Sequence, residues 1–270
     1  MQTKKSLGQY FLNSPQIIKD IVLAGNVEGG DTVLEIGPGQ GVLTEELLQT
    51  GAKVISVEKD DQLIPELQKK FAREIALKQL DLVHADILDL ELPHIAVGEY
   101  KIVANIPYYI TGQIVRMFLE SDNQPKSMTL LVQKEVAERI VAKDGKESLL
   151  SLSVKVFGEP KYIQTVSRGA FKPHPEVDSA LLNIENISKN NFTKALPWGK
   201  GGLGEEFFFK ILHLGFAHKR KQLLPNLASL YSKDKLLKVF KKCQIDPKSR
   251  AEDIKLDTWI LLCKTLEIVM

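Results

Sequence analysis

Short apolar runs alternate with amphipathic stretches over the first two thirds of the chain. Short runs of mostly apolar residues predict a buried strand at 32–36 and further strands at 53–57, 80–84 and 101–104. Between them, residues 42–48 and 61–73 repeat apolar side chains at helical spacing. Strands that alternate with helices indicate βαβ units, and so an α/β fold whose parallel sheet carries helices on both faces.

Capping and turn residues set the limits of the other elements. A helix over 14–25 is predicted by Ser14 as its cap, Pro15 at its first position and Gly25 as its stop. Further strand-like runs are 127–133, 162–166 and 179–184. The last two flank the segment FKPHP at 171–175, which its prolines make rigid, so that it could join an antiparallel pair.

The pattern changes after Ile187. Residues 188–204 are rich in Asn, Lys and Gly and predict a linker, whereas the chain beyond them shows helical periodicity only. We therefore expect a Rossmann-like domain over 1–187, a linker over 188–204 and a small all-helical domain over 205–270.

The N-terminal and C-terminal parts of the chain also differ in net charge. The net charge of the chain is +2, but residues 31–100 carry 14 acidic and 6 basic side chains, and residues 207–250 carry 11 basic and 2 acidic ones. A basic helical part beside an acidic body predicts that a polyanion binds mainly to the C-terminal part. A solvated helical surface would carry the same charges, so composition leaves that alternative open.

Other bulk properties narrow the class of protein. The chain is 44% hydrophobic and 26% charged, it has two cysteines, Cys243 and Cys263, and it lacks an apolar run of 18 residues. These features predict a globular, cytoplasmic protein without disulfides, a metal site or a membrane segment. Nothing in the pattern requires more than a monomer.

Residues that could bind a cofactor follow three of the predicted strands. The first strand leads into the turn EIGPGQG at 35–41, where Gly37 and Gly39 let the backbone approach a ligand closely. Glu58 ends the second strand and can accept hydrogen bonds from both hydroxyls of a ribose, and Asp86, after the third strand, can reach an adenine amino group. The carboxyl ends of parallel strands meet at one edge of the sheet, which predicts a nucleoside site there. Dinucleotide enzymes use a similar turn and carboxylate.

The fourth strand ends in Asn105-Ile106-Pro107-Tyr108, which favours methyl transfer over hydride transfer. The Asn105 side-chain carbonyl and the Ile106 main-chain carbonyl can accept the two N–H groups of an adenine amine and direct its lone pair at a methyl group. Pro107 presets the direction of the backbone acceptor, and Tyr108 can stack on the target base. S-adenosylmethionine is already a cationic sulfonium, so positioning suffices and no strong base is required. The base has to be unpaired or flipped out to reach this site.

Longer motifs resemble the family of ribosomal RNA adenine dimethyltransferases. They are KSLGQYFL at 5–12, EIGPGQGVLT at 35–44, NIPYYIT at 105–111, FKPHPEVDS at 171–179 and FAHKRKQL at 216–223. Together they span nearly the whole chain and are most similar to the bacterial small-subunit branch. The resemblance implies a Rossmann-like class I methyltransferase that dimethylates N6 of two adjacent adenosines. These adenosines would lie in a hairpin near the 3′ end of small-subunit (16S) rRNA, within an assembling 30S particle.

The resemblance also implies roles for individual residues. S-adenosylmethionine, with S-adenosylhomocysteine as product, would be bound by Gln9, Tyr10, Leu12, Gly37, Gly39, Glu58, Lys59, Asp86, Ile87 and Asn105. The catalytic residues would be Asn105, Pro107, Tyr108 and Phe171. Tyr108 and Phe171 would sandwich the target adenine, with Phe171 on an exposed platform formed by the rigid loop. RNA would be bound by Arg168, Lys172, Lys219, Arg220 and Lys221.

Two positions depart from the family pattern, and three alternatives share parts of it. Tyr10 stands where relatives usually have Asn or His, which leaves its side-chain contact to the cofactor open. The basic motif at 218–221 has lysines where relatives often show paired arginines, which keeps the charge and loses the bidentate fork. The alternatives are an Erm-type large-subunit dimethyltransferase, a catalytically silent nucleic-acid-binding relative and a dinucleotide oxidoreductase. The glycine turn and the motif at 216–223 fit the small-subunit branch better than the Erm type.

Overall fold

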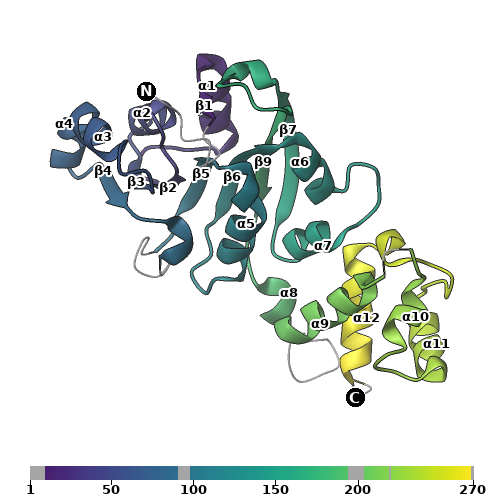
Figure 1. Cartoon of the computed structure of the whole chain (residues 1–270). Helices are drawn as coiled ribbons and strands as arrows, with labels where there is room; N and C mark the ends of the chain where they lie inside the picture. The colour runs from purple at the N-terminus through teal and green to yellow at the C-terminus, as the bar shows by residue number, and fades with distance from the viewer. Residues whose placement is uncertain (1–9, 91–97, 194–203, 219, 269–270) are drawn as a thin grey trace. The chain divides into compact units, whose positions relative to one another are not determined.

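Two compact units make up the part of the chain that the structure describes. The computed structural model describes residues 10–90, 98–193, 204–218 and 220–268. One unit combines the chain up to Ala137 with Glu159–Ile187, and the other combines Glu138–Gly158 with the chain from Ser188 onward. The first unit is built on a β-sheet and the second on helices (Figure 1).

A seven-stranded sheet forms the centre of the first unit (Figure 1). Its strands, in spatial order, are β4 (Leu80–His84), β3 (Lys53–Glu58), β2 (Thr32–Ile36), β5 (Lys101–Asn105), β6 (Ser127–Gln133), β9 (Ser179–Glu185) and β7 (Glu159–Val166). The first five are parallel, and β9 runs antiparallel to both β6 and β7. The sheet is therefore mixed, and the predicted antiparallel pair is confirmed at its edge.

The strands form where the sequence has its apolar runs because both faces of the sheet are covered. Val33–Ile36 of β2 and Met128–Val132 of β6 are at most 3% exposed at every position. A strand with one face in water would alternate apolar and polar residues, whereas a strand covered on both sides reads as a continuous apolar run. The continuous apolar runs in the sequence therefore already indicate that both faces of these two strands are buried.

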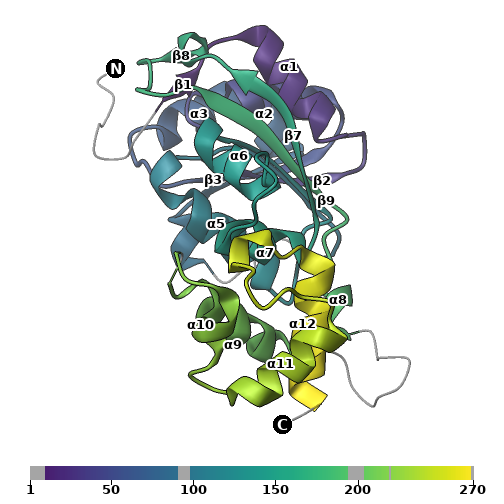
Figure 2. The same ribbon diagram turned by 90° about the vertical axis from the view of Figure 1, so that its right-hand side faces the viewer.

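Helices cover both faces of the sheet (Figure 2). The helix α2 (Val42–Gln49) carries the chain from β2 to β3 in one direction along the sheet, and α5 (Thr111–Glu120) carries it from β5 to β6 in the opposite direction. Because crossovers between parallel strands are right-handed, these two helices lie on opposite faces. The N-terminal helix α1 (Pro15–Ala24), which starts and ends where its capping residues predict, packs on α2. The connections therefore run outward in opposite directions from the neighbouring parallel strands β2 and β5. Ligand crevices open at such switch points of the strand order.

The single helix predicted over 61–73 is wrong. The structure has two helices, α3 (Ile64–Lys70) and α4 (Ala72–Ala76), which meet at Phe71 with φ −111° and ψ 27°. The Phe71 ring is 4% exposed, and one of its atoms would lie only 2.5 Å from a Cβ placed on Gly41. The ring thus packs under the glycine-rich turn, and this tertiary contact overrides the local helical periodicity.

A two-stranded sheet joins the N-terminal segment to the loop between β7 and β9. The strand β1 (Phe11–Leu12) pairs antiparallel with β8 (Phe171–Lys172), and Leu12 lies opposite Phe171. Both side chains belong to the hydrophobic core, with exposed fractions of 3% and 0%. The prediction that Phe171 lies on an exposed platform is therefore wrong. Successive side chains of a strand point to opposite faces, so this pairing turns Phe171 inward and leaves Lys172 in solvent.

Helices make up the second unit, and α6 (Lys134–Val141) leads into it. Its other helices are α7 (Leu149–Lys155), α8 (Asn190–Thr193), α9 (Glu205–Phe216), α10 (Leu223–Leu227), α11 (Lys233–Lys242) and α12 (Leu256–Ile268). Trp259 of α12 is completely buried and stacks on Phe216 of α9, with ring centroids 5.8 Å apart. The helical character predicted for the C-terminal part is confirmed where the structure describes it. The predicted linker contains α8, and residues 194–203 lie outside the described ranges.

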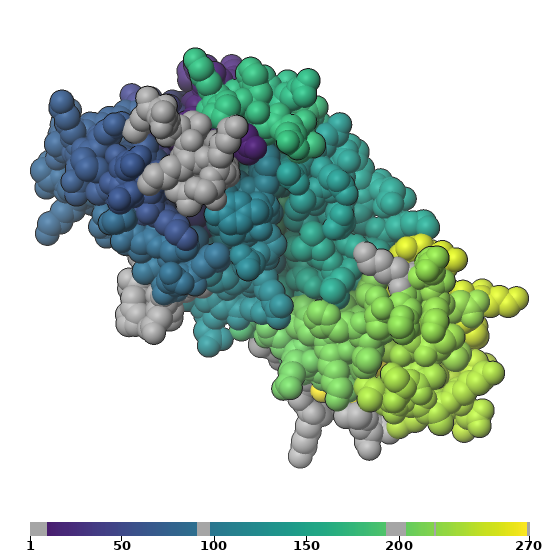
Figure 3. Space-filling view, viewed as in Figure 1, coloured from purple at the N-terminus to yellow at the C-terminus, as the bar shows by residue number. Residues whose placement is uncertain are grey.

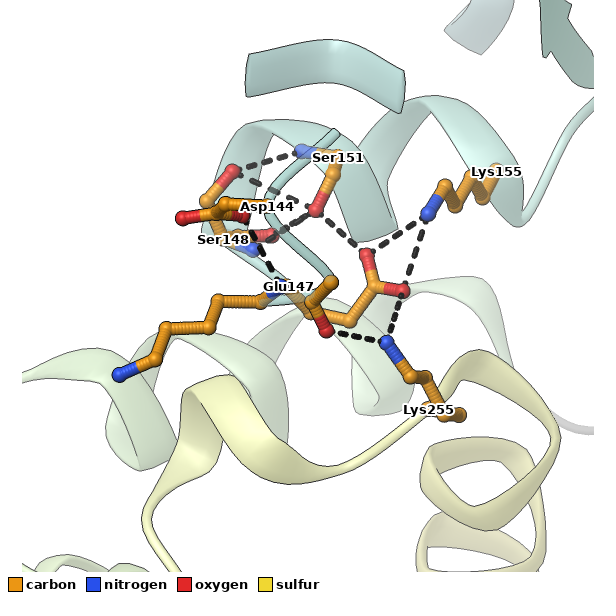
Figure 4. A network of polar contacts seen from close by, with 8 residues as sticks. Asp144, Glu147, Ser148, Ser151, Lys155 and Lys255 are labelled. Atoms are coloured by element: carbon orange, nitrogen blue, oxygen red, sulfur yellow. Dashed lines mark hydrogen bonds and ion pairs between the residues drawn. The ribbon is translucent and has the colours of Figure 1, made fainter. Parts of the chain in front are cut away.

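Segment 138–158 groups with the helical unit, although the predicted domain limits place it in the first domain. Its Glu147 is 5% exposed and accepts hydrogen bonds from Ser151 at 2.8 Å and Lys155 at 2.9 Å, with Lys255 3.6 Å away (Figure 4). A buried carboxylate requires such partners, so the network ties this segment to the residues just before α12. The limits 1–187, 188–204 and 205–270 stay predictions, since they describe functional domains rather than compact units.

Candidate active site

A crevice opens at the carboxyl ends of the parallel strands, where β2 and β5 are neighbours. It encloses about 1190 Å³ including its open mouth, and residues after β2, β3, β4 and β5 line it together with the segment around β1. The predicted site residues on its wall are Tyr10, Leu12, Gly37, Gly39, Glu58, Lys59, Asp86, Ile87, Asn105, Pro107 and Tyr108. The sheet topology therefore brings together residues that the sequence carries at separate strand ends.

The glycine turn after β2 exposes its backbone to this crevice. Gly37 and Gly39 have left-handed backbone conformations, with φ 68° and 58°, which residues with a side chain rarely adopt. A Cβ on Gly37 would meet no atom within 4 Å, whereas a Cβ on Gly39 would lie 3.1 Å from the ring of Phe11. A ligand can therefore approach the backbone at Gly37 without meeting another part of the protein.

Glu58, the last residue of β3, is held by backbone donors. Its Oε2 accepts a hydrogen bond from the Gly39 N–H at 3.2 Å, and its Oε1 accepts one from the Asp60 N–H at 2.8 Å. Burial raises the pKa of Glu58, and these two hydrogen bonds oppose the effect. A backbone hydrogen bond from Lys59 has the same effect on the pKa. A carboxylate offers about four acceptor sites, so Glu58 keeps capacity to accept a hydrogen bond from a ribose hydroxyl.

Asp86 and Lys59 form an ion pair at the rim of the crevice. The Lys59 ammonium donates to Oδ2 of Asp86, and the Leu88 N–H donates to Oδ1 at 3.1 Å. The hydrogen bond from Lys59 lowers the pKa of Asp86, and the same contact raises the pKa of Lys59. The Asp86 carboxylate is therefore ionised, and it keeps sites at which it can accept further hydrogen bonds. The sequence did not predict that these two proposed cofactor ligands would pair with each other.

Hydrogen bonds and burial hold the tetrapeptide after β5. The Asn105 Nδ2 donates to the main-chain carbonyl of Tyr10 at 3.1 Å. A carbonyl can only accept, so this contact fixes the orientation of the amide and leaves Oδ1 of Asn105 available as an acceptor. Ile106 is 1% exposed, and the hydroxyls of Tyr108 and Ser179 share a hydrogen bond of 2.6 Å. Burial raises the pKa of Tyr108, so its phenol is neutral at physiological pH.

The ring that faces Tyr108 belongs to Tyr10. The two ring centroids are 5.6 Å apart and the ring planes are inclined by 27°. Phe171 is fully buried in the core and is absent from the wall of the crevice. The structure therefore brings Asn105, Pro107 and Tyr108 to one wall of the crevice. The catalytic role predicted for Phe171 stays a prediction.

Glu35 is a residue of the crevice wall that the sequence analysis did not single out. It is 1% exposed, and its Oε2 accepts hydrogen bonds from Thr44 at 2.7 Å and Ser56 at 2.5 Å. Its Oε1 has no hydrogen-bond partner within the described ranges. Burial raises the pKa of Glu35 to about 7. The sequence signal for it is a carboxylate inside an otherwise apolar strand, because such a residue is rarely buried without a reason.

The predicted RNA-binding residues are exposed where the structure describes them. Arg168 lies just before β8, and Lys172 is the last residue of β8, both in the first unit. This green segment forms part of the molecular surface in Figure 3. Arg220 and Lys221 lie between α9 and α10 in the second unit. Gln9 and Lys219 lie outside the described residues. The RNA-binding roles stay predictions.

Two further findings concern membranes and metals. Within the ranges that the structure describes, no helix is both long and apolar enough to cross a membrane. In the same ranges, His, Cys, Asp and Glu side chains do not gather in groups of three or more that could hold a metal ion.

Known proteins match the chain over almost its entire length. The family model described as ribosomal RNA adenine dimethylase matches residues 1–267. A ribosomal RNA small subunit methyltransferase A of Dehalococcoides mccartyi is 41% identical over 270 residues, which cover 97% of this chain and 88% of the relative. A crystal structure of a dimethyladenosine transferase from Plasmodium falciparum matches with a TM-score of 0.80 at 25% identity, over 96% of this chain and 98% of that one.

A large-subunit enzyme shares the architecture as well. The crystal structure of the 23S rRNA methyltransferase ErmE matches with a TM-score of 0.76 at 26% identity, over 95% of this chain and 99% of that one. These structures and the strand order of the sheet confirm the predicted Rossmann-like methyltransferase fold. The match to the family model and the relative with 41% identity show that the chain belongs to the ribosomal RNA adenine dimethylase family, and the structural matches agree with this.

Proposed function

We propose that this protein dimethylates the N6 amines of two adjacent adenosines in a hairpin near the 3′ end of small-subunit (16S) rRNA. It uses S-adenosylmethionine and acts as a cytoplasmic monomer on an assembling 30S particle. The proposal depends on the orientation of Asn105 at the crevice. Its Nδ2 donates to the Tyr10 carbonyl, so its Oδ1 is available to accept a hydrogen bond from an amine. Family membership supports the reaction, and the relatives named small subunit methyltransferase A support the substrate.

The residues of the crevice fit S-adenosylmethionine. Its ribose hydroxyls match the free acceptor sites of Glu58, and its adenine amino group matches Asp86. The Oε1 of Glu35 is buried and without a partner in the described ranges, and an ammonium group such as that of the methionine part would satisfy it. Gly37 offers open space for close approach. Gln9, Tyr10, Leu12, Gly39, Lys59 and Ile87 complete the proposed cofactor site.

The tetrapeptide residues hold the acceptor amine in this mechanism. The cofactor, when bound, supplies a methyl group on a cationic sulfonium that leaves as a neutral thioether. Asn105 Oδ1 and the Ile106 carbonyl accept the two N–H groups, and Pro107 fixes the direction of the second acceptor. Tyr108 stacks on the adenine, and its hydrogen bond to Ser179 keeps the ring in place. Once the nitrogen carries its new methyl group, it releases one proton to water.

Two observations favour the small-subunit substrate over the Erm-type alternative. The relatives at 36–42% identity are small-subunit enzymes, whereas ErmE is 26% identical. The glycine turn and the motif at 216–223 also fit the small-subunit branch. The exposed Arg168, Lys172, Arg220 and Lys221, with Lys219, are the proposed phosphate contacts. A catalytically silent relative would have no use for an intact Asn105 beside Glu58 and Asp86.

Mass spectrometry of ribosomal RNA tests the proposal directly. Undermethylated small subunits and, separately, large subunits are incubated with the protein and labelled S-adenosylmethionine, and the RNA is digested and sequenced. We expect two neighbouring N6,N6-dimethyladenosines near the 3′ end of small-subunit RNA, and none with the Asn105→Ala variant. Labelling of large-subunit RNA alone would contradict the substrate assignment. Failure to bind S-adenosylmethionine in calorimetry would contradict the enzymatic assignment altogether.

A further inference from the structure

Hydrogen bonds from β3 hold the start of the glycine-rich turn at the crevice. Three residues of this turn, Gly37, Gly39 and Gly41, have left-handed backbone conformations. Glycine loses more conformational freedom on folding than any other residue, so a turn of this composition needs restraints to keep a single shape. The Gly37 N–H donates to the Val57 carbonyl at 2.9 Å, and the Gly39 N–H donates to Glu58 at 3.2 Å. These contacts leave the end of the turn, at Gly41, to be held from elsewhere.

A lysine at the end of α3 holds the end of the turn. The Lys70 ammonium donates to the main-chain carbonyls of Gly41, at 3.1 Å, and Gln40, at 3.4 Å. It also lies 2.9 Å from the carboxylate of Glu45, in the first turn of α2. The same ammonium is 5.0 Å from the centroid of the Phe71 ring, which packs under Gly41. One cation of α3 therefore contacts the last two residues of the glycine turn and the helix that follows them.

The contact at Gly41 reaches the part of the turn that faces the crevice. The Gly41 N–H donates to the Pro38 carbonyl at 2.8 Å, which closes the turn on itself. Pro38 follows Gly37, and both line the crevice together with Gln40. A displacement of Gly41 therefore moves the peptide groups to which a ligand would lie closest.

We propose that Lys70 is a positioning residue for cofactor binding, which holds the glycine turn in the shape that receives S-adenosylmethionine. This inference rests on the proposed function and adds a residue from behind the cofactor site. Lys70 is not among the described residues that line the crevice. It therefore acts through the Gln40 and Gly41 carbonyls and not by touching the cofactor.

The size of the effect follows from the fraction of molecules whose turn has the binding-competent shape. The apparent dissociation constant of a ligand rises in proportion as this fraction falls. A hydrogen bond from a charged donor changes an equilibrium by about 10-fold or more, and the 37% exposure of the Lys70 side chain keeps its effect at the lower end. Once the cofactor is bound, the turn already has its competent shape. Loss of the ammonium should therefore weaken cofactor binding without slowing the bound enzyme.

Calorimetry with S-adenosylmethionine, combined with methyl transfer to undermethylated small subunits, tests the proposal. Lys70→Met keeps the apolar stem and removes the ammonium, so it should raise the dissociation constant of the cofactor by about 5- to 10-fold. The kcat at saturating cofactor and the affinity for RNA should stay at the wild-type values. Lys70→Arg keeps a charged donor and should restore the affinity to within about 2-fold of the wild type. Lys69→Met is the matched control and should have no effect, because Lys69 is exposed and has no ion pair within the described ranges.

Glu45→Gln separates the carbonyl contacts from the ion pair. It removes the charge on α2 and leaves Lys70 bound to the Gln40 and Gly41 carbonyls, so the affinity for the cofactor should not change. A loss in Glu45→Gln as large as that in Lys70→Met would overturn the proposal, because the ion pair would then hold the turn.

Urea unfolding of the same variants without cofactor separates positioning from general stabilisation. Exposed ion pairs contribute little to stability, so the unfolding midpoint of Lys70→Met should stay close to that of the wild type. A large fall of this midpoint would show that Lys70 holds the whole fold, and would overturn the proposal. Wild-type affinity in Lys70→Met, a loss of kcat in place of affinity, or no rescue by Lys70→Arg would also overturn it. Failure of the wild type to bind the cofactor would instead overturn the proposed function.

Discussion

Replacing Glu35 with glutamine should change how the stability of the protein depends on pH. Burial raises the pKa of Glu35 from its ordinary value of 4.5 to about 7. Because the folded protein then holds this proton more tightly than the unfolded chain, wild-type stability falls as the pH rises from 4.5 through 7. One pKa unit corresponds to about 1.4 kcal/mol, so ionisation of Glu35 should lower the free energy of unfolding by about 3 kcal/mol between pH 4 and pH 8. The side chain is 1% exposed, so solvent screening does not reduce this figure much.

Urea unfolding of the wild type and of Glu35→Gln, without cofactor and at several pH values, measures this effect. Glutamine can still accept the hydrogen bonds from Thr44 and Ser56 but cannot ionise. Its fixed cost is the same at every pH, so the difference between the two proteins isolates the titration. We expect the variant to gain about 3 kcal/mol on the wild type from pH 4 to pH 8. Glu66→Gln, at an exposed site of α3, is the matched control. A difference that does not vary with pH would refute the reasoning.

Three further predictions address the acceptor, the RNA interface and the helical unit. Asn105→Ala should abolish methyl transfer because it removes the Oδ1 acceptor, and it should leave RNA binding intact because every basic side chain remains. Parallel methyl-transfer and filter-binding assays measure both effects, and near-normal turnover would contradict the mechanism. Neutralising Lys219, Arg220 and Lys221 together should weaken RNA binding and reduce the salt slope of log K by about 2 to 3; a slope unchanged in a salt titration would place this cluster outside the interface. Gly215→Ala should destabilise the helical unit by about 1–3 kcal/mol in the urea unfolding assay, because a Cβ at this position would lie 2.4 Å from the Trp259 ring. Gly112→Ala in α5 is the control and should have little effect, because its Cβ would meet no atom within 4 Å. Equal effects of the two glycine variants would show that Trp259 adjusts freely.

Local patterns were sufficient for most of the sheet and for part of the site. The strands β2 and β6 begin and end where their apolar runs do, because burial on both faces selects a continuous apolar segment. The edge strand β4 also has the predicted limits, although only Leu80 in it is buried. Glu58 and Asn105 were found because the carboxyl ends of parallel strands share one edge, a rule that needs no knowledge of the strand order. Where packing opposed periodicity, as at Phe71 between α3 and α4, the local pattern failed.

The sequence by itself determined that this is an α/β methyltransferase-like chain with a glycine turn, two carboxylates and an Asn-Ile-Pro-Tyr segment at successive strand ends. Tertiary structure alone decided which side chains meet. It buried Phe171 through the pairing of β1 with β8, brought Tyr10 onto Tyr108, and left one oxygen of Glu35 without a described partner. The physical reason is the same in each case: these contacts join residues far apart in the chain, and their energy depends on burial and strand pairing that no local window of sequence contains.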